Sequence, residues 1–253
     1  MKSFSRRKML WTGAAAAAGV AGLVEAPKLM RRAGILAPDC VGAYGPGEAL
    51  TYAASRIIAP NARAREFSRS WISTTPFANS TYGPIPAEFA QQKAEGFANW
   101  KLSVSGMVMH PAVFSVGDLK QMGRSSQITE VACEEGWSYI AEWIGTPLAK
   151  MLDEVQPLGP ARYVMYTSMR DGWTDLIDMH DARHPQTLLT WGMNDGDLPF
   201  GFGGPLRLRL PKQLGYRNVK YVHQMVLTDS LKGFPKGVGL ADPANGYSWY
   251  AGI

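Results

Sequence analysis

The sequence predicts an α+β fold with mixed β-sheets and short helices. Two observations support this class. Between residues 100 and 228, apolar residues alternate with polar ones over short runs, as they do in half-buried strands. The segments between these runs are brief, so only short helices fit there. The chain has 253 residues, 46% of them hydrophobic, which is enough for one sizeable core.

The first 26 residues are predicted to be an export signal. Arg6 and Arg7 precede the Ala- and Gly-rich apolar run 11–24. This run is shorter than the roughly 20 residues that a membrane span needs, so a signal is the better interpretation. Paired arginines before such a run are typical of the twin-arginine route, which exports folded proteins, often around a cofactor. We therefore expect a periplasmic protein, with an uncleaved membrane anchor as the alternative to a cleaved signal.

The charge of the chain argues against a nucleic-acid partner. The formal net charge is +5, but residues 1–26 contribute Lys2, Arg6, Arg7 and Lys8 against a single acid, Glu25. Without this segment the net charge is only +2. Such a small excess, spread along the chain, does not produce the basic surface that nucleic-acid binding requires.

Residues 27–95 show no sustained period. We interpret 27–75 as an extended arm with short helices at most, and 76–253 as the catalytic domain. Within this domain the alternating pattern predicts six strands, at 100–108, 126–133, 161–169, 187–193, 205–210 and 219–227. In 205–210 the leucines point one way and Arg207 and Arg209 the other.

Two helices and one turn complete the predicted elements. Ser115 and Asp118 resemble a capping box for a helix over 116–122. A second helix is predicted to begin with Pro147 in its first position. Its apolar face follows at the spacing i, i+3, i+4, i+7, which comprises Leu148, Met151, Leu152 and Val155. Asn194, Asp195 and Gly196 predict a tight turn.

Cys133, at the end of the run 126–133, has three interpretations. As a nucleophile it would need a histidine, and the candidates His110, His180, His184 and His223 carry no local signature. Glu134 and Glu135 would also raise the pKa of its thiol. One cysteine with dispersed histidines shows no zinc spacing. A buried inert cysteine remains open, and so does a thiolate that is the single protein ligand of a soft metal held mainly by an organic cofactor.

Five linked motifs bear on that last interpretation, and they lie in order between about 75 and 253. They are CEEGWS (133–138) with WIGTPL (143–148), DARHPQT (181–187), GGPLRL (203–208), LGY (214–216) with Lys220 soon after, and YSWYAGI (247–253). Together they resemble the molybdopterin-dependent sulfite oxidase superfamily, most of all its exported single-domain bacterial branch. The resemblance implies a sulfite-oxidase-type molybdopterin-binding fold and a molybdenum cofactor.

The resemblance also implies the site residues. Cys133 matches the cysteine that ligates molybdenum, and Thr167 matches a threonine near the pterin. Arg207 and Lys220 match the basic residues that hold the phosphate and the pterin ring. The remaining matches are backbone contacts at Asn218 and Val219, and Asn79 in PFANSTYG (76–83) as an N-terminal contact. A dianionic phosphate favours such a set: a guanidinium fork, an ammonium and backbone N–H groups.

One position departs from the family. Where the family has a His or Asn cofactor contact before Gly-Gly-Pro-Leu-Arg, this chain has Phe202, which cannot form that hydrogen bond. Either another group takes over the contact, or the pocket is remodelled. A cofactor-free binding module that keeps the fold is therefore one alternative function.

The reaction is predicted from the residues beside the ligand. Sulfite oxidases have an arginine shortly after the cysteine, whereas this chain has two acids and Trp137, which repel sulfite and offer a face to a cation. We expect oxygen-atom transfer from a neutral or cationic S-oxide or N-oxide, with sulfite-type oxidation as the alternative. Glu135 is the candidate for proton relay, next to Trp137. With no haem-attachment motif, the family implies a haem-containing electron-transfer partner, soluble or membrane-bound.

Overall fold

The computed structural model describes residues 29–30, 45–79, 84–231 and 247–253. The chain divides into two units, Met1–Pro60 and Asn61–Ile253. The twin-arginine segment and Cys40 lie outside the described residues. The predicted division into a signal segment, an arm and a catalytic domain stays a prediction. No helix within the described residues is long and apolar enough to cross a membrane.

Among the described residues of the first unit, the longest element is helix α2 (Gly45–Ile57). Within it the Arg56 guanidinium lies over the Tyr52 ring, 4.5 Å from its centroid, as residues four apart on a helix can. The expectation of short helices at most in this region was wrong, because α2 is 13 residues long. Its periodicity was missed because polar and small residues interrupt the apolar ones.

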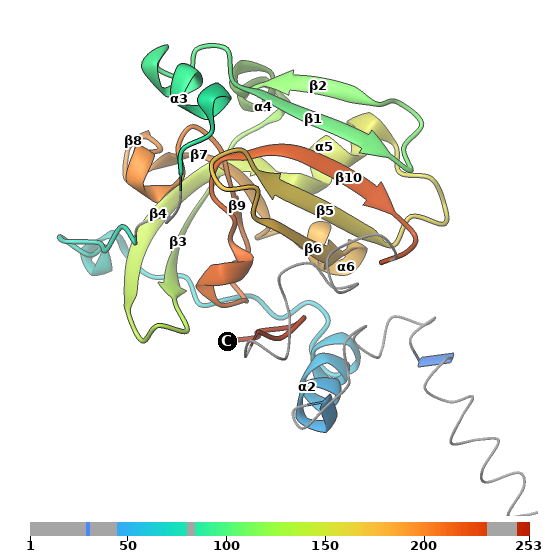
Figure 1. Cartoon of the computed structure of the whole chain (residues 1–253). Coiled ribbons are helices and arrows are strands. Elements are labelled where there is room, and N and C mark those ends of the chain that lie inside the picture. The colour runs from blue at the N-terminus through green and yellow to red at the C-terminus, as the bar shows by residue number, and fades with distance from the viewer. Residues whose placement is uncertain (1–28, 31–44, 80–83, 232–246) are drawn as a thin grey trace, which may run out of the picture. The chain divides into compact units, whose positions relative to one another are not determined.

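One five-stranded sheet is formed by β1 (Lys101–Gly106), β2 (Ala112–Ser115), β5 (Tyr163–Ser168), β6 (Thr174–Asp178) and β10 (Val222–Thr228). The strand order is β2-β1-β10-β5-β6 (Figure 1). β1 pairs with β10 in parallel, and the other neighbours are antiparallel. The sheet is thus mixed, as predicted.

The second sheet is antiparallel and contains β3 (Ser125–Ala132), β4 (Ser138–Pro147), β7 (Leu188–Met193), β8 (Gly196–Asp197) and β9 (Arg207–Arg209). β4 was not predicted. All of its residues from 141 to 146 are buried, so the sequence does not show the alternation of apolar and polar residues that is typical of a half-buried strand. The predicted turn is confirmed. Asn194 and Asp195 both have positive φ, which suits the twist of the β7–β8 hairpin.

Short helices complete the domain. They are α3 (Ala87–Ala94), α4 (Val116–Met122), α5 (Leu148–Val155), α6 (Met179–Ala182) and the 3-10 turns η1 (Arg69–Trp71), η2 (Phe200–Phe202) and η3 (Gly215–Arg217). The capping box of α4 is confirmed. All four predicted apolar residues of α5 are buried. Pro147 precedes this helix instead of opening it, because its extended backbone still pairs with Leu188 in β7.

One apolar core joins both sheets. It contains Leu102 and Val104 of β1, Val164 of β5, Leu189 of β7 and the buried face of α5. A smaller apolar cluster lies on the second sheet and includes Tyr139, Trp143 and Met193, with Trp137 and Phe202 packed against it. This second cluster supports the residues described below.

The DARHPQT motif forms hydrogen bonds with the first residues of the second unit. The Gln186 side chain accepts a hydrogen bond from the Ala64 N–H and donates to its carbonyl, and a His184 ring nitrogen lies 3.0 Å from the Ala62 carbonyl. Further along, the Phe67 N–H donates to Ile128 of β3. The motif therefore has a structural role, because it holds residues 62–66 to the domain.

Candidate active site

A cavity of about 490 Å³ opens where the β3–β4 hairpin, the end of β5, β9 and the η3 turn meet. Eight of the nine predicted site residues line it: Asn79, Cys133, Glu135, Trp137, Arg207, Asn218, Val219 and Lys220. Residues up to 141 positions apart are thus brought to one place, as Lys220 and Asn79 show.

Cys133 stands at the base of the β3–β4 hairpin. Its N–H donates to the Trp137 carbonyl and its carbonyl accepts from Gly136, which closes a turn with Glu134 and Glu135 at the tip. Gly136 has a φ of 89°, a conformation that favours glycine. The η3 turn packs against the cysteine, because a Cβ added to Gly215 would lie 3.5 Å from the Cys133 Cβ. The sulfur is therefore held at a fixed point of the cavity wall.

The surroundings of Cys133 do not suit a nucleophile. Burial, and then the two neighbouring carboxylates, raise the pKa of its thiol to about 12. The sulfur lies 3.1 Å from a Glu134 oxygen and 3.9 Å from a Glu135 oxygen. None of the four histidines is among the described residues that line the cavity. A thiol with raised pKa, beside carboxylates and without a histidine among the residues that line the cavity, is not activated for attack.

The opposite side of the cavity is basic. Arg207 is 3% exposed, and its guanidinium donates to the carbonyls of Phe202 and Asn218 at 2.8 and 2.7 Å. The Lys220 ammonium donates to the carbonyls of Asn79 and Gly201 at 2.9 and 2.7 Å. Burial, and then Arg207, lower the pKa of Lys220 to about 7. Burial also lowers the pKa of Arg207. Arg207 thus lies on a strand but does not face solvent.

Two features of the GGPLRL motif bring these cations together. Gly203 has a φ of 103°, and a Cβ there would lie 2.9 Å from Lys220 side-chain atoms and 3.2 Å from the Arg207 Cβ. A glycine is thus required for the two side chains to pass so close to the backbone. Phe202 contributes its carbonyl to Arg207, and its ring packs edge-on against Tyr139. Phe202 therefore packs against two residues that line the cavity, Tyr139 and Arg207, and orients the cation through its backbone carbonyl.

Arg209 is a buried cation behind the cavity, and the sequence did not single it out as a site residue. It is 0% exposed and donates to the Asn218 side-chain oxygen at 2.8 Å, to the Thr129 hydroxyl and to the Glu130 carbonyl. Its spacing of two from Arg207 on a strand was the available signal, because such residues share a face.

These groups fit a phosphate-bearing ligand. Among the described residues, no carboxylate pairs with Arg207, Arg209 or Lys220, and the buried Nε atoms of both arginines have no hydrogen-bond partner. The Val219 N–H, which is buried, also has no partner among the described residues, whereas the Asn218 N–H donates to Gly215. Buried cations without counter-ions are costly, so the arrangement is complete only with an anion.

Aromatic rings line the outer part of the cavity. Trp137 stacks on Tyr139, with centroids 5.9 Å apart, and its indole N–H donates to Glu135 at 2.7 Å. Tyr247 packs against Tyr216 at 4.8 Å and against Trp173 at 6.5 Å. Of these rings the sequence indicated only Trp137 as a site residue. Tyr139 was missed with its strand, β4.

Thr167 is the predicted site residue that does not line the cavity. It lies on β5, where its hydroxyl is 3.1 Å from that of Thr174. Its neighbour Ser168 lines the cavity instead. The assignment of Thr167 to the pterin site stays a prediction.

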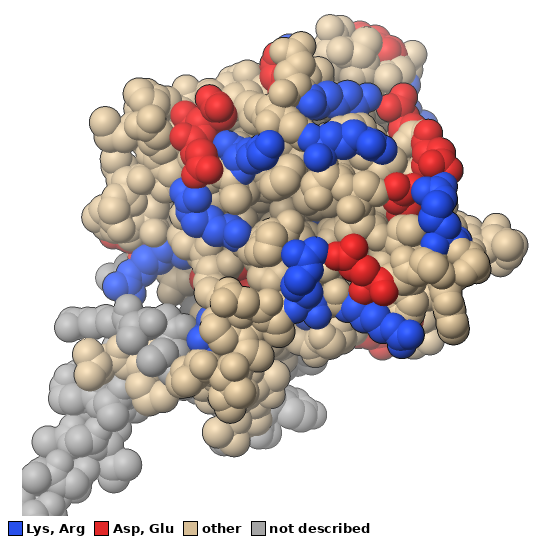
Figure 2. All heavy atoms as spheres, turned by 180° about the vertical axis from the view of Figure 1, so that it is seen from behind, with Lys and Arg blue, Asp and Glu red and all other residues tan. Residues whose placement is uncertain are grey.

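One face of the molecule carries mixed charge. On the face drawn in Figure 2, lysine and arginine side chains lie beside aspartates and glutamates across the described residues. At physiological salt, exposed charges are largely screened beyond about 8 Å. This face therefore does not present a strong field of one sign.

The chain is similar to a known protein family and to two curated proteins. Residues 83–233 match the family described as oxidoreductase molybdopterin binding domain. The putative protein-methionine-sulfoxide reductase subunit YedZ1 of Azospira oryzae is 34% identical over 194 residues, which is 76% of this chain and 69% of that protein. The protein-methionine-sulfoxide reductase catalytic subunit MsrP of Ralstonia nicotianae is 29% identical over 271 aligned positions, covering 98% of this chain and 75% of that protein.

A solved structure is also similar. The sulfane dehydrogenase SoxCD from Paracoccus pantotrophus matches with a TM-score of 0.50 and 21% sequence identity. The match covers 52% of this chain but only 38% of that one. At this identity the likeness is one of fold, and it agrees with the predicted α+β class.

Proposed function

The chain belongs to the oxidoreductase molybdopterin-binding domain family, and on that premise we propose that it is an exported reductase that removes oxygen from a neutral or cationic S-oxide or N-oxide. As a member of the family it is an oxidoreductase with a molybdopterin cofactor. The observation that carries the proposal is the division of the cavity. Its inner part is formed by the buried Arg207 and the half-buried Lys220. Its outer part is formed by the exposed Glu134 and Glu135 and by the half-buried rings of Trp137 and Tyr247, and Cys133 also lines the cavity.

One set of cavity residues is proposed to bind the cofactor, and another to receive the substrate. Arg207, Lys220 and the Val219 N–H, which has no partner among the described residues, bind the phosphate-bearing cofactor, and Cys133 offers its sulfur as the protein ligand to molybdenum. When bound, the molybdenum cofactor supplies two-electron oxygen-atom transfer. Trp137 and Tyr247 cover the outer part, where a substrate enters. In this proposal Glu135 delivers the protons that reduction of an oxide to water consumes, and its hydrogen bond from the Trp137 indole N–H supports this role.

The acids beside Cys133 set the choice of reaction. Glu134 and Glu135 are exposed at the tip of the hairpin and repel an anion such as sulfite, while they leave a neutral oxide unaffected. The two relatives in the comparison are named as subunits of protein-methionine-sulfoxide reductases. Their names support an S-oxide as the substrate class and a partner subunit as the electron donor. We propose a haem-containing protein for this partner.

The export route is part of the proposal. The paired arginines 6 and 7 before the apolar run 11–24 support passage through the twin-arginine machinery into the periplasm, after the cofactor has been inserted. Changing both arginines to lysine should leave the loaded protein in the cytoplasm. Cell fractionation with a periplasmic marker protein measures this, and unchanged export of the variant would contradict the route.

The first test of function is metal analysis by mass spectrometry on protein made in its own host. We expect about one molybdenum per chain in the wild type, because one cysteine offers one ligand position. In Cys133→Ser the metal should be lost or become redox-silent, and reduction of sulfoxides should cease. Molybdenum-free wild-type protein from a host that makes the cofactor would favour the alternative, a binding module that keeps the fold.

A further inference from the structure

Arg209 presents a physical problem that the cavity itself does not solve. Its guanidinium is fully buried, yet its partners among the described residues are only neutral oxygens, those of Asn218, Thr129 and Glu130. Burial, and then the neighbouring Arg207, lower the pKa of Arg209 to about 9. A buried charge of this kind is retained only where something stabilises it.

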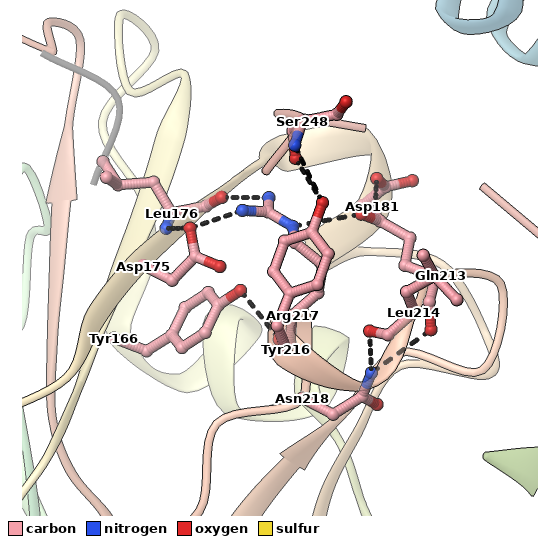
Figure 3. A network of polar contacts seen from close by, with 10 residues as sticks. All are labelled: Tyr166, Asp175, Leu176, Asp181, Gln213, Leu214, Tyr216, Arg217, Asn218 and Ser248. Atoms are coloured by element: carbon pink, nitrogen blue, oxygen red, sulfur yellow. Dashed lines mark hydrogen bonds and ion pairs between the residues drawn. The ribbon is translucent and has the colours of Figure 1, made fainter. Parts of the chain in front are cut away.

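The same domain neutralises another buried arginine in the ordinary way. Arg217 is 1% exposed, and its guanidinium forms an ion pair with the buried Asp175 and donates to the Leu176 carbonyl (Figure 3). Asp175 is the largest of the groups that raise the pKa of Arg217 against the effect of burial. The fold can therefore pair a buried arginine with an acid, and at β9 it does not.

The geometry of β9 places Arg209 directly behind the cavity. Arg207 and Arg209 share one face of the strand, and both guanidiniums lie over the Trp143 ring, 5.2 and 5.3 Å from its centroid. Two cations side by side repel each other, which makes their shared environment favourable to an anion.

Asn218 connects the two arginines. Its backbone carbonyl accepts from Arg207, and its side-chain oxygen accepts from Arg209. Its amide donates to the carbonyls of Gln213 and Leu214, as Figure 3 shows. The side chain is thus fully used within the protein. Arg209 thereby fixes Asn218, and Asn218 in turn fixes the guanidinium that lines the cavity.

We propose that Arg209 is a positioning residue of the phosphate site, which supplies a second buried positive charge behind Arg207 and holds Asn218 in place. The inference rests on the proposed function in one respect only, that the ligand of this site carries a phosphate. Arg209 acts through Arg207 and Asn218, since it is not among the residues that line the cavity.

The test uses cofactor-free protein and inorganic phosphate as the probe. Phosphate affinity is measured by ³¹P NMR titration and by the phosphate-dependent rise in melting temperature, at several salt concentrations. Arg209→Gln should bind phosphate at least about tenfold more weakly, and its affinity should depend less on salt, because a charge has been removed. Arg209→Lys keeps the charge and should remain within about threefold of the wild type.

The controls separate charge from folding. Arg183→Gln removes an exposed arginine that pairs with Asp153 and should leave phosphate affinity and its salt dependence unchanged. Wild-type affinity and salt dependence in Arg209→Gln would overturn the proposal, and so would loss of binding in a folded Arg209→Lys protein. If Arg209→Gln does not fold, the phosphate affinity of Arg209→Lys decides whether the proposal holds. Phosphate binding requires no turnover, so a failure here is distinct from a failure of the proposed reaction.

Discussion

The Lys220 side chain is suited to bind an anion, but its buried charge lowers the stability of the cofactor-free protein. It binds two backbone carbonyls at the cavity and lies near Arg207, an environment that favours a neutral amine until an anion arrives. The position is therefore built for ligand binding at the expense of the stability of the cofactor-free protein. Residues that lower the stability of the protein in this way are expected at functional sites.

This conflict predicts a pH dependence. The pKa of Lys220 falls from 10.5 to about 7 in the folded protein, so the unfolded chain binds more protons between these values. The contribution of Lys220 to the free energy of unfolding therefore rises from pH 7 toward pH 10. Lys220→Met should stabilise the cofactor-free protein most at pH 7, and this advantage should shrink toward pH 10 while cofactor content falls at every pH.

Urea unfolding of the cofactor-free wild type and Lys220→Met at pH 7 and pH 9 measures the effect. Lys150→Met is the matched control, because that lysine lies on α5, away from the cavity. Equal pH dependence in the wild type and in Lys220→Met would show that the amine is not destabilised in the folded state.

At the scale of elements, the η3 turn is held by a buried network that joins it to β6. The Arg217 side chain pairs with Asp175 and receives further support from Gln213, which in turn donates to Asp181 of α6. The Tyr166 hydroxyl of β5 donates to the Arg217 carbonyl at 3.0 Å. The turn that carries Tyr216 and Asn218 is thus fixed from three sides, which makes the cavity wall rigid (Figure 3).

Removing one partner of this network should be severe. Arg217→Met leaves Asp175 buried without a counter-ion, which costs about 3 to 5 kcal/mol of unfolding free energy. The double variant Arg217→Met with Asp175→Asn should recover much of this loss, because no charge remains buried. Chemical denaturation of both proteins tests the coupling. Equal losses in the single and the double variant would mean that the charge on Asp175 is not what makes the pair important.

At the scale of the whole molecule, the second sheet contributes both a cation and acids to one cavity, and the first sheet completes its wall. β9 of the second sheet supplies Arg207, and the β3–β4 hairpin of the same sheet carries Glu134 and Glu135. The first sheet adds Ser168 at the end of β5, and the turn after it adds Trp173. An anionic cofactor and a substrate that is not anionic are thereby directed to different places.

This division predicts substrate selectivity by charge. For sulfoxides of similar size, kcat/KM should decrease from cationic through neutral to anionic substrates, because the outer part carries acids and aromatic faces. Glu134→Gln should reduce the difference between cationic and anionic sulfoxides by roughly two- to fivefold, as expected for an exposed charge. Steady-state kinetics at low and high salt measure this. A preference for anionic sulfoxides would contradict the proposed role of the acids and aromatic rings in substrate selection.

Much of the site was predictable because its residues are chemically distinctive. Cys133 is the only cysteine between residues 41 and 253, and its motif resembles that of a known family, so it could be predicted as the metal ligand. Arg207, Lys220 and Trp137 followed in the same way, and the cavity brings them together. Tyr139 could not be inferred, because its strand, β4, is buried on both faces and shows no alternation of apolar and polar residues. Arg209 was missed as a site residue although its spacing from Arg207 places both on one face of a strand.

The sequence by itself determined the α+β class, the strands with clear alternation, the capped helix at 116–122, the family and the cofactor. These depend on local patterns and on motifs whose chemistry is specific. Only the tertiary structure decided which charges lack partners, which carbonyls hold Arg207 and Lys220, and that Phe202 orients a cation through its backbone. These facts depend on how the loops around β9 and residue 79 pack against one another in the folded chain. No local sequence pattern shows whether a buried charge will have a counter-ion.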